Sequence, residues 1–309
     1  MKTHAKLAAL FLSLVLLFSL AACSSSPSAS APPSPAPAQS EEPSEPAAEP
    51  SSEPDNTLAA TEIQVFIAAS LENSFIDIID LYNESQPNVK VTYNADSSGT
   101  LLTQIQEGYE CDIFFSAGAS QINTAEAEGL AIEGTRVDLL RNEVVLITWK
   151  GSGTTVTGIE NIGDAASIAL ADGSVPVGKY TRTALQNLGI LDKDLDAATI
   201  STEDISAALG GVEINECGNV SKVKEAVKEG SNEVGTVYYS DAYSVRDDVD
   251  IIEHISPDLT GSIVYPMVRI ANDEADDAQT AAAEDFFAFL QIPEVISIFE
   301  EYMLVYNLD

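Results

Sequence analysis

Basic residues are scarce in this chain. Its 309 residues include 14 lysines and arginines against 49 aspartates and glutamates, and the formal net charge is −35 at pH 7. Such an acidic surface repels phosphate backbones and anionic lipid headgroups, so nucleic acids and such lipid surfaces are excluded as partners. An anionic small ligand is compatible with this charge only if neutral N–H and O–H donors hold it in a dry cleft, where local dipoles outweigh a distant, screened field.

Residue types that carry catalysis or hold metals are also few. Beyond the N-terminal segment the only histidine is His254, and no G-x-S-x-G nucleophile motif occurs. A histidine-rich metal centre is excluded by number, whereas a calcium site made of carboxylates alone stays open, although no EF-hand spacing occurs. The cysteines Cys23, Cys111 and Cys217 have neither metal-ligand nor C-x-x-C spacing. Because Cys111 lies beside a predicted buried strand, we interpret it as a small core residue rather than as the disulfide partner of Cys217.

A short hydrophobic run marks the N-terminus. It covers residues 8–20, follows two lysines, and is too short for a membrane-spanning helix. The next residues, Leu20-Ala21-Ala22-Cys23, resemble the lipobox of bacterial lipoproteins, in which the chain is cut before a lipidated cysteine. An ordinary signal peptide with an incidental cysteine is the alternative. We predict a lipoprotein signal peptide at residues 1–22 and a lipid anchor at Cys23 on the extracellular face of the cell membrane.

The segment after Cys23 lacks the residues that build a core. Residues 24–58 are almost all Ser, Pro, Ala and Glu, a composition that buries too little apolar surface to fold. We predict a solvated tether over residues 23–59. At about 3.1 Å per residue it would reach on the order of 100 Å when fully extended.

Strand and helix patterns alternate from residue 60 to residue 309. This alternation predicts an α/β fold with a mainly parallel sheet. The clearest predicted strands cover residues 63–68, 89–93, 113–116, 143–149, 167–171, 234–238 and 263–270.

Serine-bearing turns follow the first two of these strands. Ser70 stands at the N-cap position expected for an amphipathic helix, and Ser97 and Ser98 stand in the turn before a second helix. The carboxyl ends of parallel strands form the edge at which open sheets bind ligands. The free N–H groups and the positive dipole end of each helix favour an anion there.

A third turn has the pattern G-x4-G-K over residues 173–179, which is nearly a phosphate-binding P-loop. Tyr180 stands where a P-loop needs Ser or Thr, and Pro176 removes one backbone N–H. We therefore predict another turn that offers N–H groups to an anion, and not a nucleotide site. Tyr238 ends a later strand with a phenol; it is either a ligand group or a packing residue.

Seven short motifs, in this order, resemble those of the molybdate-binding proteins of ABC importers. They are Ala68-Ala69-Ser70-Leu71, Ser97-Ser98-Gly99-Thr100-Leu101, Cys111-Asp112-Ile113-Phe114-Phe115-Ser116-Ala117, Asn142-Glu143-Val144-Val145-Leu146, Val175-Pro176-Val177-Gly178-Lys179-Tyr180, residues 235–242, and Tyr265-Pro266. The match runs over nearly all of residues 62–309. It implies a type II periplasmic-binding-protein fold, in which two α/β lobes joined by a hinge hold an oxyanion in a cleft. Residues 60–145 and 246–309 are then expected in lobe I, and residues 146–245 in lobe II.

The resemblance also implies the residues that bind the ligand. In that family two serine turns, two backbone N–H groups and a tyrosine hold the anion, which here implies Ser70, Ser98, Val177, Val220 and Tyr238. Two of these assignments have competitors. Glu203-Asp204-Ile205 also resembles the motif that supplies the fourth contact, but the 18-residue spacing from Val220 to Tyr238 suits one helix and one strand. Ser97 and Ser98 cannot be separated by sequence.

The function implied by the resemblance is that of a substrate-binding lipoprotein. It would capture molybdate or tungstate, deliver it to an ABC permease and ATPase complex, act as a monomer, and need no cofactor and no catalytic residue. A carrier of another oxyanion such as sulfate is one alternative. An extracellular metal-dependent phosphoesterase is an alternative from a different class, as is an adhesin or scaffold.

Overall fold

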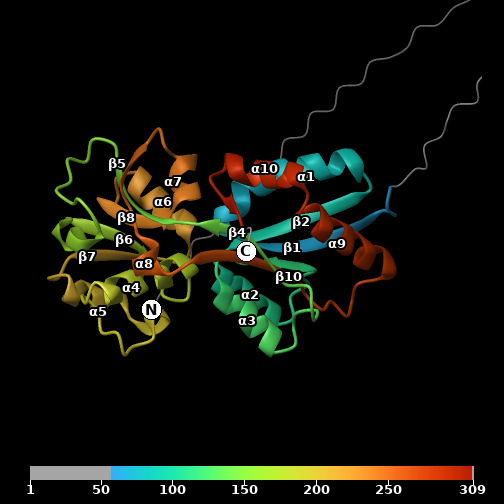
Figure 1. The fold of residues 1–309 in the computed structure, drawn as a ribbon, viewed down its shortest axis with the longest axis horizontal. Helices are drawn as coiled ribbons and strands as arrows, with labels where there is room; N and C mark the ends of the chain where they lie inside the picture. Colours follow the sequence, from blue (N-terminus) through green and yellow to red (C-terminus); the bar gives the residue numbers. More distant parts are fainter. Residues whose placement is uncertain (1–56, 308–309) are drawn as a thin grey trace, which may run out of the picture. The chain divides into compact units, whose positions relative to one another are not determined.

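Two β-sheets organise residues 57–307, which are the residues that the computed structural model describes (Figure 1). The first sheet has the strand order β11-β4-β10-β3-β1-β2, and the second has the order β7-β6-β8-β5-β9. The predicted signal peptide, Cys23 and nearly all of the predicted tether lie outside the described residues. The mixed α/β class predicted from the alternation of patterns is confirmed.

The central strands of the first sheet have apolar residues on both faces. Its strands are β1 (Thr61–Ala68), β2 (Val89–Asp96), β3 (Ile113–Phe115), β4 (Val137–Asn142), β10 (Ile263–Arg269) and β11 (Val305–Tyr306). Val65 and Ile67 face one hydrophobic cluster, whereas Phe66 between them faces the other, as the period of two in a strand requires. The central strand β1 is therefore buried on both faces.

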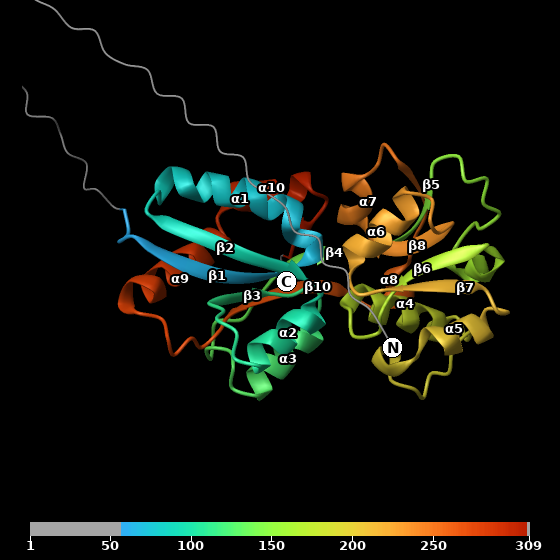
Figure 2. The same ribbon diagram turned by 180° about the vertical axis from the view of Figure 1, so that it is seen from behind.

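Helices cover both faces of the first sheet (Figures 1 and 2). One face packs against α1 (Glu72–Ser85), α9 (Asp277–Phe289) and α10 (Pro293–Glu301), and the other against α2 (Ser98–Gln106) and α3 (Ala119–Ala127). The rings of Tyr82 and Phe286 pack edge to face with centroids 4.8 Å apart, which joins α1 to α9. The amphipathic helix predicted after Ser70 is α1, and its buried side contains Phe75, Ile78 and Tyr82.

The second sheet has the same layered arrangement. Its strands are β5 (Val144–Trp149), β6 (Ser167–Ala171), β7 (Glu213–Cys217), β8 (Val234–Tyr238) and β9 (Val249–His254). Its helices are α4 (Pro176–Asn187), α5 (Thr202–Ala208), α6 (Val220–Lys228) and α7 (Tyr239–Ser244), with α6 and α7 over one face and α4 and α5 over the other (Figure 1). Three short helical segments, η2 (Ile159–Asp164), η3 (Ala197–Thr199) and α8 (Pro257–Thr260), lie in the connections.

The seven predicted strands are confirmed to within a few residues, but the expectation of mainly parallel sheets is wrong. β1 pairs in parallel with β2 and β3, and β6 with β7 and β8, whereas the remaining pairs are antiparallel. Every antiparallel pair includes β4, β5 or β10, and each of these three strands lies next to a place where the chain changes sheet.

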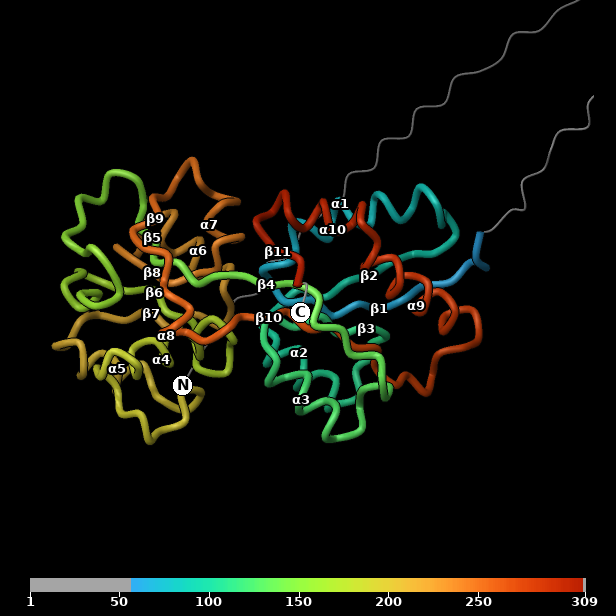
Figure 3. The backbone as a smooth tube through the Cα atoms, viewed as in Figure 1, coloured from blue at the N-terminus to red at the C-terminus, as the bar shows by residue number. Residues whose placement is uncertain are grey.

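The chain crosses between the sheets twice (Figure 3). The first crossing is at Glu143, between β4 and β5, and the second covers residues 255–262, between β9 and β10. We call these the crossing segments, and we call the parts around the first and second sheets lobe I and lobe II. The second crossing comes later than the boundary expected at residue 246, because β9 pairs with β5 in the second sheet.

Cys111 and Cys217 are free and buried, and the Cys111 thiol donates to the Ile113 carbonyl at 3.3 Å. The interpretation of Cys111 as a core residue is confirmed.

Within residues 57–307 no group of three or more acidic, histidine or cysteine side chains is placed to hold a metal. In the same residues no helix combines the length and the apolar character needed to cross a membrane.

Candidate oxyanion site

The starts of four helical segments converge on one small cavity of about 10 Å³. Ser70, Ser98, Val220 and Tyr238 line it, and Val177 follows the lining residue Pro176. The full lining is Ala68, Ala69, Ser70, Asp96, Ser97, Ser98, Ala117, Val175, Pro176, Val220 and Tyr238. Lobe I and lobe II both contribute, so residues from distant parts of the chain meet here.

Ser98 and Ser97 have different roles in the α2 turn. Ser97 is the N-cap of α2, and its hydroxyl accepts from the Thr100 N–H at 3.1 Å. Ser98 is 1% exposed, and its hydroxyl oxygen accepts from the Ala117 N–H at 3.0 Å. Because this bond uses an acceptor position, the Ser98 proton is free to be donated. The geometry therefore favours Ser98 over Ser97 as a ligand donor.

Ser70 is not an N-cap, contrary to the prediction. A 3₁₀ turn, η1 (Ala69–Leu71), stands between β1 and α1, and neither Ala68 before η1 nor Leu71 before α1 makes a side-chain cap bond. The Ser70 hydroxyl lies instead 3.0 Å from the hydroxyl of Tyr265. The first N–H groups of a 3₁₀ turn have no acceptor within the turn, and Ala69 and Ser70, which start this one, both line the cavity.

The start of α4 is held close to the end of β6. A β-carbon at Gly178 would overlap the carbonyl oxygens of Ala171 and Asp172, so glycine is required for this approach. Arg182, which is fully buried, donates to the Ala171 carbonyl at 2.7 Å and to the Gly178 carbonyl at 3.0 Å. Since Pro176 has no N–H, Val177 offers the first backbone donor of α4, and no carbonyl of its own helix lies ahead of it.

The start of α6 offers a similar donor at Val220. Asn219 is the N-cap, and its side-chain oxygen accepts from the Lys222 N–H at 3.0 Å. The N–H of Val220 precedes that bond and has no acceptor within the helix. The competing residue Ile205 lies within α5, is 1% exposed, and packs in the hydrophobic core of lobe II away from the cavity. The geometry therefore favours Val220.

Tyr238 contributes a phenol that stays protonated. Burial raises the pKa of Tyr238 well above its ordinary value, so its hydroxyl is a donor at neutral pH. That hydroxyl donates to the carbonyl oxygen of Ala117 at 3.3 Å, and its ring packs edge to face on Tyr265 with centroids 5.5 Å apart. The side chain thus reaches from lobe II into lobe I.

Further contacts close the two lobes around the cavity. Asn219 Nδ2 donates to Asp96 Oδ1 at 3.0 Å, and Gln121 Nε2 donates to the Ser174 carbonyl at 3.4 Å. A β-carbon at Gly99 would lie 2.9 Å from the Ser174 carbonyl oxygen, which shows how closely the α2 and α4 turns approach. The lobes therefore have to part before a ligand can enter.

Residues 63–302 match the sequence profile of a protein family that is described as bacterial extracellular solute-binding protein.

The chain belongs to this family of solute-binding proteins.

Its relatives include proteins named for molybdate. The solute-binding protein is 28% identical over 241 residues to YvgL of Bacillus subtilis, named an ABC transporter substrate-binding lipoprotein, with 78% of this chain and 85% of the relative covered. It is 29% identical over 248 residues to the molybdate-binding protein ModA of Escherichia coli, with 78% and 88% covered. The solved substrate-binding domain of a molybdenum ABC transporter from Clostridium difficile matches with a TM-score of 0.57 and 30% identity, covering 80% of this chain and 99% of that one. The resemblance noted in the sequence is confirmed, and the relatives are solute-binding proteins rather than enzymes.

The residues that sequence reasoning missed in this solute-binding protein are mostly neighbours of the predicted ones. Asp96, Ala117 and Asn219 contact the cavity or close it. Asp96 comes just before the motif at residues 97–101, Ala117 ends the motif at residues 111–117, and Asn219 comes just before the assigned residue Val220. Tyr265 and Asn142 lie within such motifs but had no assigned role. His254 does not line the cavity, and its Nδ1 lies 2.8 Å from Glu143 Oε2.

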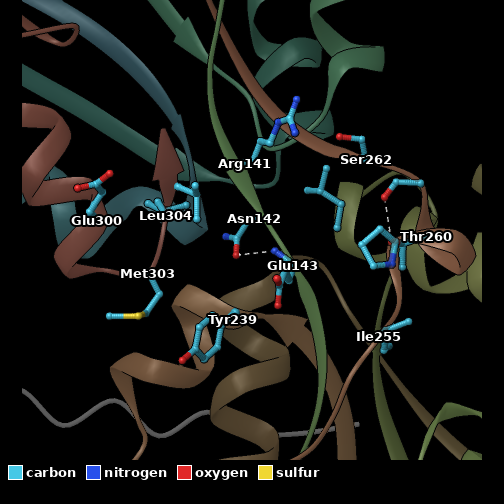
Figure 4. A pocket seen from close by; sticks show the side chains of 14 residues that line it. Arg141, Asn142, Glu143, Tyr239, Ile255, Thr260, Ser262, Glu300, Met303 and Leu304 are labelled. Carbon is cyan, nitrogen blue, oxygen red and sulfur yellow. Dashed lines mark hydrogen bonds between the residues drawn. The ribbon is translucent and has the colours of Figure 1, made fainter. Parts of the chain in front are cut away.

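A second, wider cavity of about 730 Å³ lies beside the crossing segments (Figure 4). Its lining includes Asn142, Glu143, Tyr239, Ile255 and Thr260, and none of the five predicted binding residues. The smaller cavity, in contrast, collects the hydroxyl groups of Ser70, Ser98 and Tyr238 and the starts of α2, α4 and α6. The chemistry of an oxyanion site therefore belongs to the smaller one.

Proposed function

We propose that this solute-binding protein captures molybdate or tungstate and delivers it to an ABC importer. The observation that carries the proposal is the convergence of Ser70, Ser98, Val220 and Tyr238 on one cavity, with Val177 directly after the lining residue Pro176. These groups are neutral donors, and a tetrahedral dianion has four oxygens that accept from them. The Tyr238 hydroxyl, which donates to the Ala117 carbonyl in this structure, would turn its proton to the ligand on binding. The relatives named as molybdate-binding proteins support the choice of ligand.

Helix starts supply part of the attraction in this site. α2, α4 and α6 each have eight or more residues and begin at the cavity, so their aligned peptide dipoles add positive potential there. Among residues 57–307, no lysine or arginine lines the cavity. A chain with a net charge of −35 can therefore hold an anion, because short-range donors in a dry site outweigh the distant acidic surface.

Delivery and location rest on the N-terminal segment and on the family. A lipid anchor at Cys23 and a tether over residues 23–59 would keep the binding lobes near the membrane that holds the permease. The hinge motion of the two lobes about the crossing segments would open the cavity for loading and release. The relative YvgL, which is named a lipoprotein, supports this arrangement.

Isothermal titration calorimetry with molybdate, tungstate, sulfate and phosphate tests the proposal. Donors spaced for the longer bonds of molybdate leave sulfate too small to meet them all, and each missed donor stays desolvated and unpaired. We expect molybdate and tungstate to bind more than about 100-fold more tightly than sulfate, a gap of about 2.8 kcal/mol. Equal affinity for sulfate would replace the proposal by that of a sulfate carrier.

A further inference from the structure

We propose that Asn142 and Tyr265 are positioning residues that aim the hydroxyl proton of Ser70 into the oxyanion site. The inference rests on the proposed function of that site and adds two residues that do not line its cavity. The three side chains form a chain of hydrogen bonds from the first crossing segment to the ligand site. Asn142, Tyr265 and Ser70 are at most 9% exposed, so water competes little for these bonds.

The chain starts at a fixed amide. The Glu143 backbone N–H donates to Asn142 Oδ1 at 2.9 Å, and this bond is drawn in Figure 4. Because Oδ1 accepts, the amide presents its NH₂ group on the other side. Asn142 Nδ2 donates one proton to the hydroxyl of Tyr265 at 3.1 Å and the other to the hydroxyl of Ser240 at 2.9 Å. Both donors of the amide are therefore used, and its orientation is set.

The fixed amide sets the direction of the Tyr265 hydroxyl. Its oxygen is bonded to Asn142 Nδ2 and Ser70 Oγ, and the hydroxyl of Tyr238 is a third neighbour within hydrogen-bond reach. The Asn142 NH₂ group cannot accept a proton, and the Tyr238 hydroxyl is already directed at the Ala117 carbonyl, so we assign the Tyr265 proton to the bond with Ser70 Oγ at 3.0 Å. Burial raises the pKa of Tyr265 well above its ordinary value, so this proton is present at neutral pH.

The last step concerns Ser70. Its oxygen accepts from Tyr265, and its own proton is then left to donate toward the cavity that Ser70 lines. Ser98 is set in the same way by a different donor, the Ala117 N–H. Both serine hydroxyls thus have an acceptor position filled from behind, which leaves their protons for the ligand oxygens. A hydroxyl that is oriented before binding loses less entropy when the ligand arrives.

The chain of bonds also joins the site to the crossing segments. Asn142 ends β4 just before the first crossing, Tyr265 lies in β10 after the second, and Ser240 belongs to α7 in lobe II. Asn142 therefore contacts both lobes at once. A rotation of lobe II that pulls Ser240 away changes the bonds of the amide that orients Tyr265.

A double-mutant cycle with Tyr265→Phe and Ser70→Ala tests the proposal by calorimetry with molybdate. We expect each single change to lower affinity about 10-fold or more, because a hydrogen bond to a charged ligand is lost or misdirected. The double variant should bind no more weakly than Ser70→Ala alone. A structural role for Tyr265 would instead give additive losses, and additive losses overturn the proposal.

Asn142→Asp provides an independent variant. The new carboxylate keeps the acceptor for the Glu143 N–H but replaces the NH₂ donor by an oxygen that attracts the Tyr265 proton. Ser70 would then donate to Tyr265 rather than to the ligand. We expect Asn142→Asp to lower molybdate affinity at least as much as Tyr265→Phe does. In a protein that already carries Ser70→Ala, Asn142→Asp should lower the affinity no further. A further fall in affinity there would reflect the added charge and would count against the proposal.

Tyr82→Phe is the matched control, since Tyr82 is a buried tyrosine whose hydroxyl donates to Asp285 at 2.8 Å, far from the cavity. It should lower stability and leave affinity unchanged.

If the wild-type protein binds sulfate in place of molybdate, the proposed function fails, and the same cycle with sulfate still supports or overturns the role of Tyr265. If it binds neither molybdate, tungstate, sulfate nor phosphate, both proposals are overturned.

Discussion

Asp96 and Asn219 form a hydrogen bond between the two lobes, with Asn219 Nδ2 3.0 Å from Asp96 Oδ1. Asp96 also accepts from the Ser97 N–H at 2.7 Å, and its side chain lines the proposed oxyanion cavity. A carboxylate therefore stands at the rim of the proposed anion site. It joins the lobes through Asn219, and its charge would oppose an anionic ligand.

Asp96→Asn should separate these two effects. The amide oxygen can still accept from Asn219 and Ser97, while the charge is removed. We expect molybdate affinity to rise by up to about tenfold, or ~1.4 kcal/mol, because a like charge near a dianion is lost. Perrhenate has a similar shape and a single charge, so its affinity should rise less. A fall in molybdate affinity measured by calorimetry would mean that the bond to Asn219 depends on the charge.

Ser98→Ala removes a hydroxyl donor from the proposed site and leaves the cap at Ser97 in place. A hydrogen bond to a charged group contributes roughly 1.5–3 kcal/mol, so molybdate affinity should fall about 10- to 150-fold. Ser297→Ala, in the exposed face of α10, is the matched control and should bind as the wild type does. Affinity within twofold of wild type for Ser98→Ala would remove Ser98 from the site.

Cys23→Ser tests the proposed anchor. The variant should pass into the culture medium while the wild type stays with the membrane fraction, because a serine cannot take the lipid. Binding of molybdate by the released protein should be unchanged, since Cys23 lies outside the lobes. Fractionation followed by immunoblotting measures the effect. Retention of the variant in the membrane fraction is the result that contradicts a lipid anchor.

Asp241 should make the stability of the fold depend on pH. Burial raises the pKa of this carboxyl from 3.8 to about 6, although Lys224 Nζ at 3.7 Å partly opposes the shift. Between pH 3.8 and about pH 6 the folded protein keeps the Asp241 proton that the unfolded chain has lost. The stability that this group contributes is therefore fully present below about pH 4 and is lost as the pH rises through about 6. The loss amounts to at most ~3 kcal/mol in the free energy of unfolding.

Urea unfolding of the wild type and of Asp241→Asn measures this contribution. The free energy of unfolding of the wild type, relative to the variant, should fall between about pH 4 and pH 7. The variant itself supplies the reference, because the other titrating groups are common to both proteins. A difference that stays constant across this range would show that Asp241 does not titrate there.

The turns of the proposed site depend on local pattern and could be predicted from the sequence. Ser98 and Val220 stand at strand–turn–helix junctions, and these junctions can be read from apolar spacing and turn residues. Ser70 was correctly placed after a strand but wrongly taken as an N-cap, because a single 3₁₀ turn leaves no separate mark in the sequence. The strands β4, β7, β9 and β11 were missed, and the outward faces of β7, β9 and β11 carry exposed residues that blur the apolar pattern.

Contacts between distant residues could not be predicted in the same way. The bond between Ser70 and Tyr265 joins residues 195 positions apart, and that between Asn142 and Tyr265 joins residues 123 apart. Neither pair has a spacing rule, since their meeting depends on which strands become neighbours. β10 returns to the first sheet beside β3, and that placement brings Tyr265 to the end of β1.

The close approach of Gly99 to the Ser174 carbonyl has a mechanical consequence. An alanine at position 99 would place a methyl group 2.9 Å from that oxygen, and the oxygen belongs to backbone and cannot swing aside. The methyl would act as a wedge between the α2 and α4 turns. Gly99→Ala would then keep every proposed ligand donor and yet hold the two lobes slightly apart. Such a protein could contact its ligand in the open state but could not close fully around it.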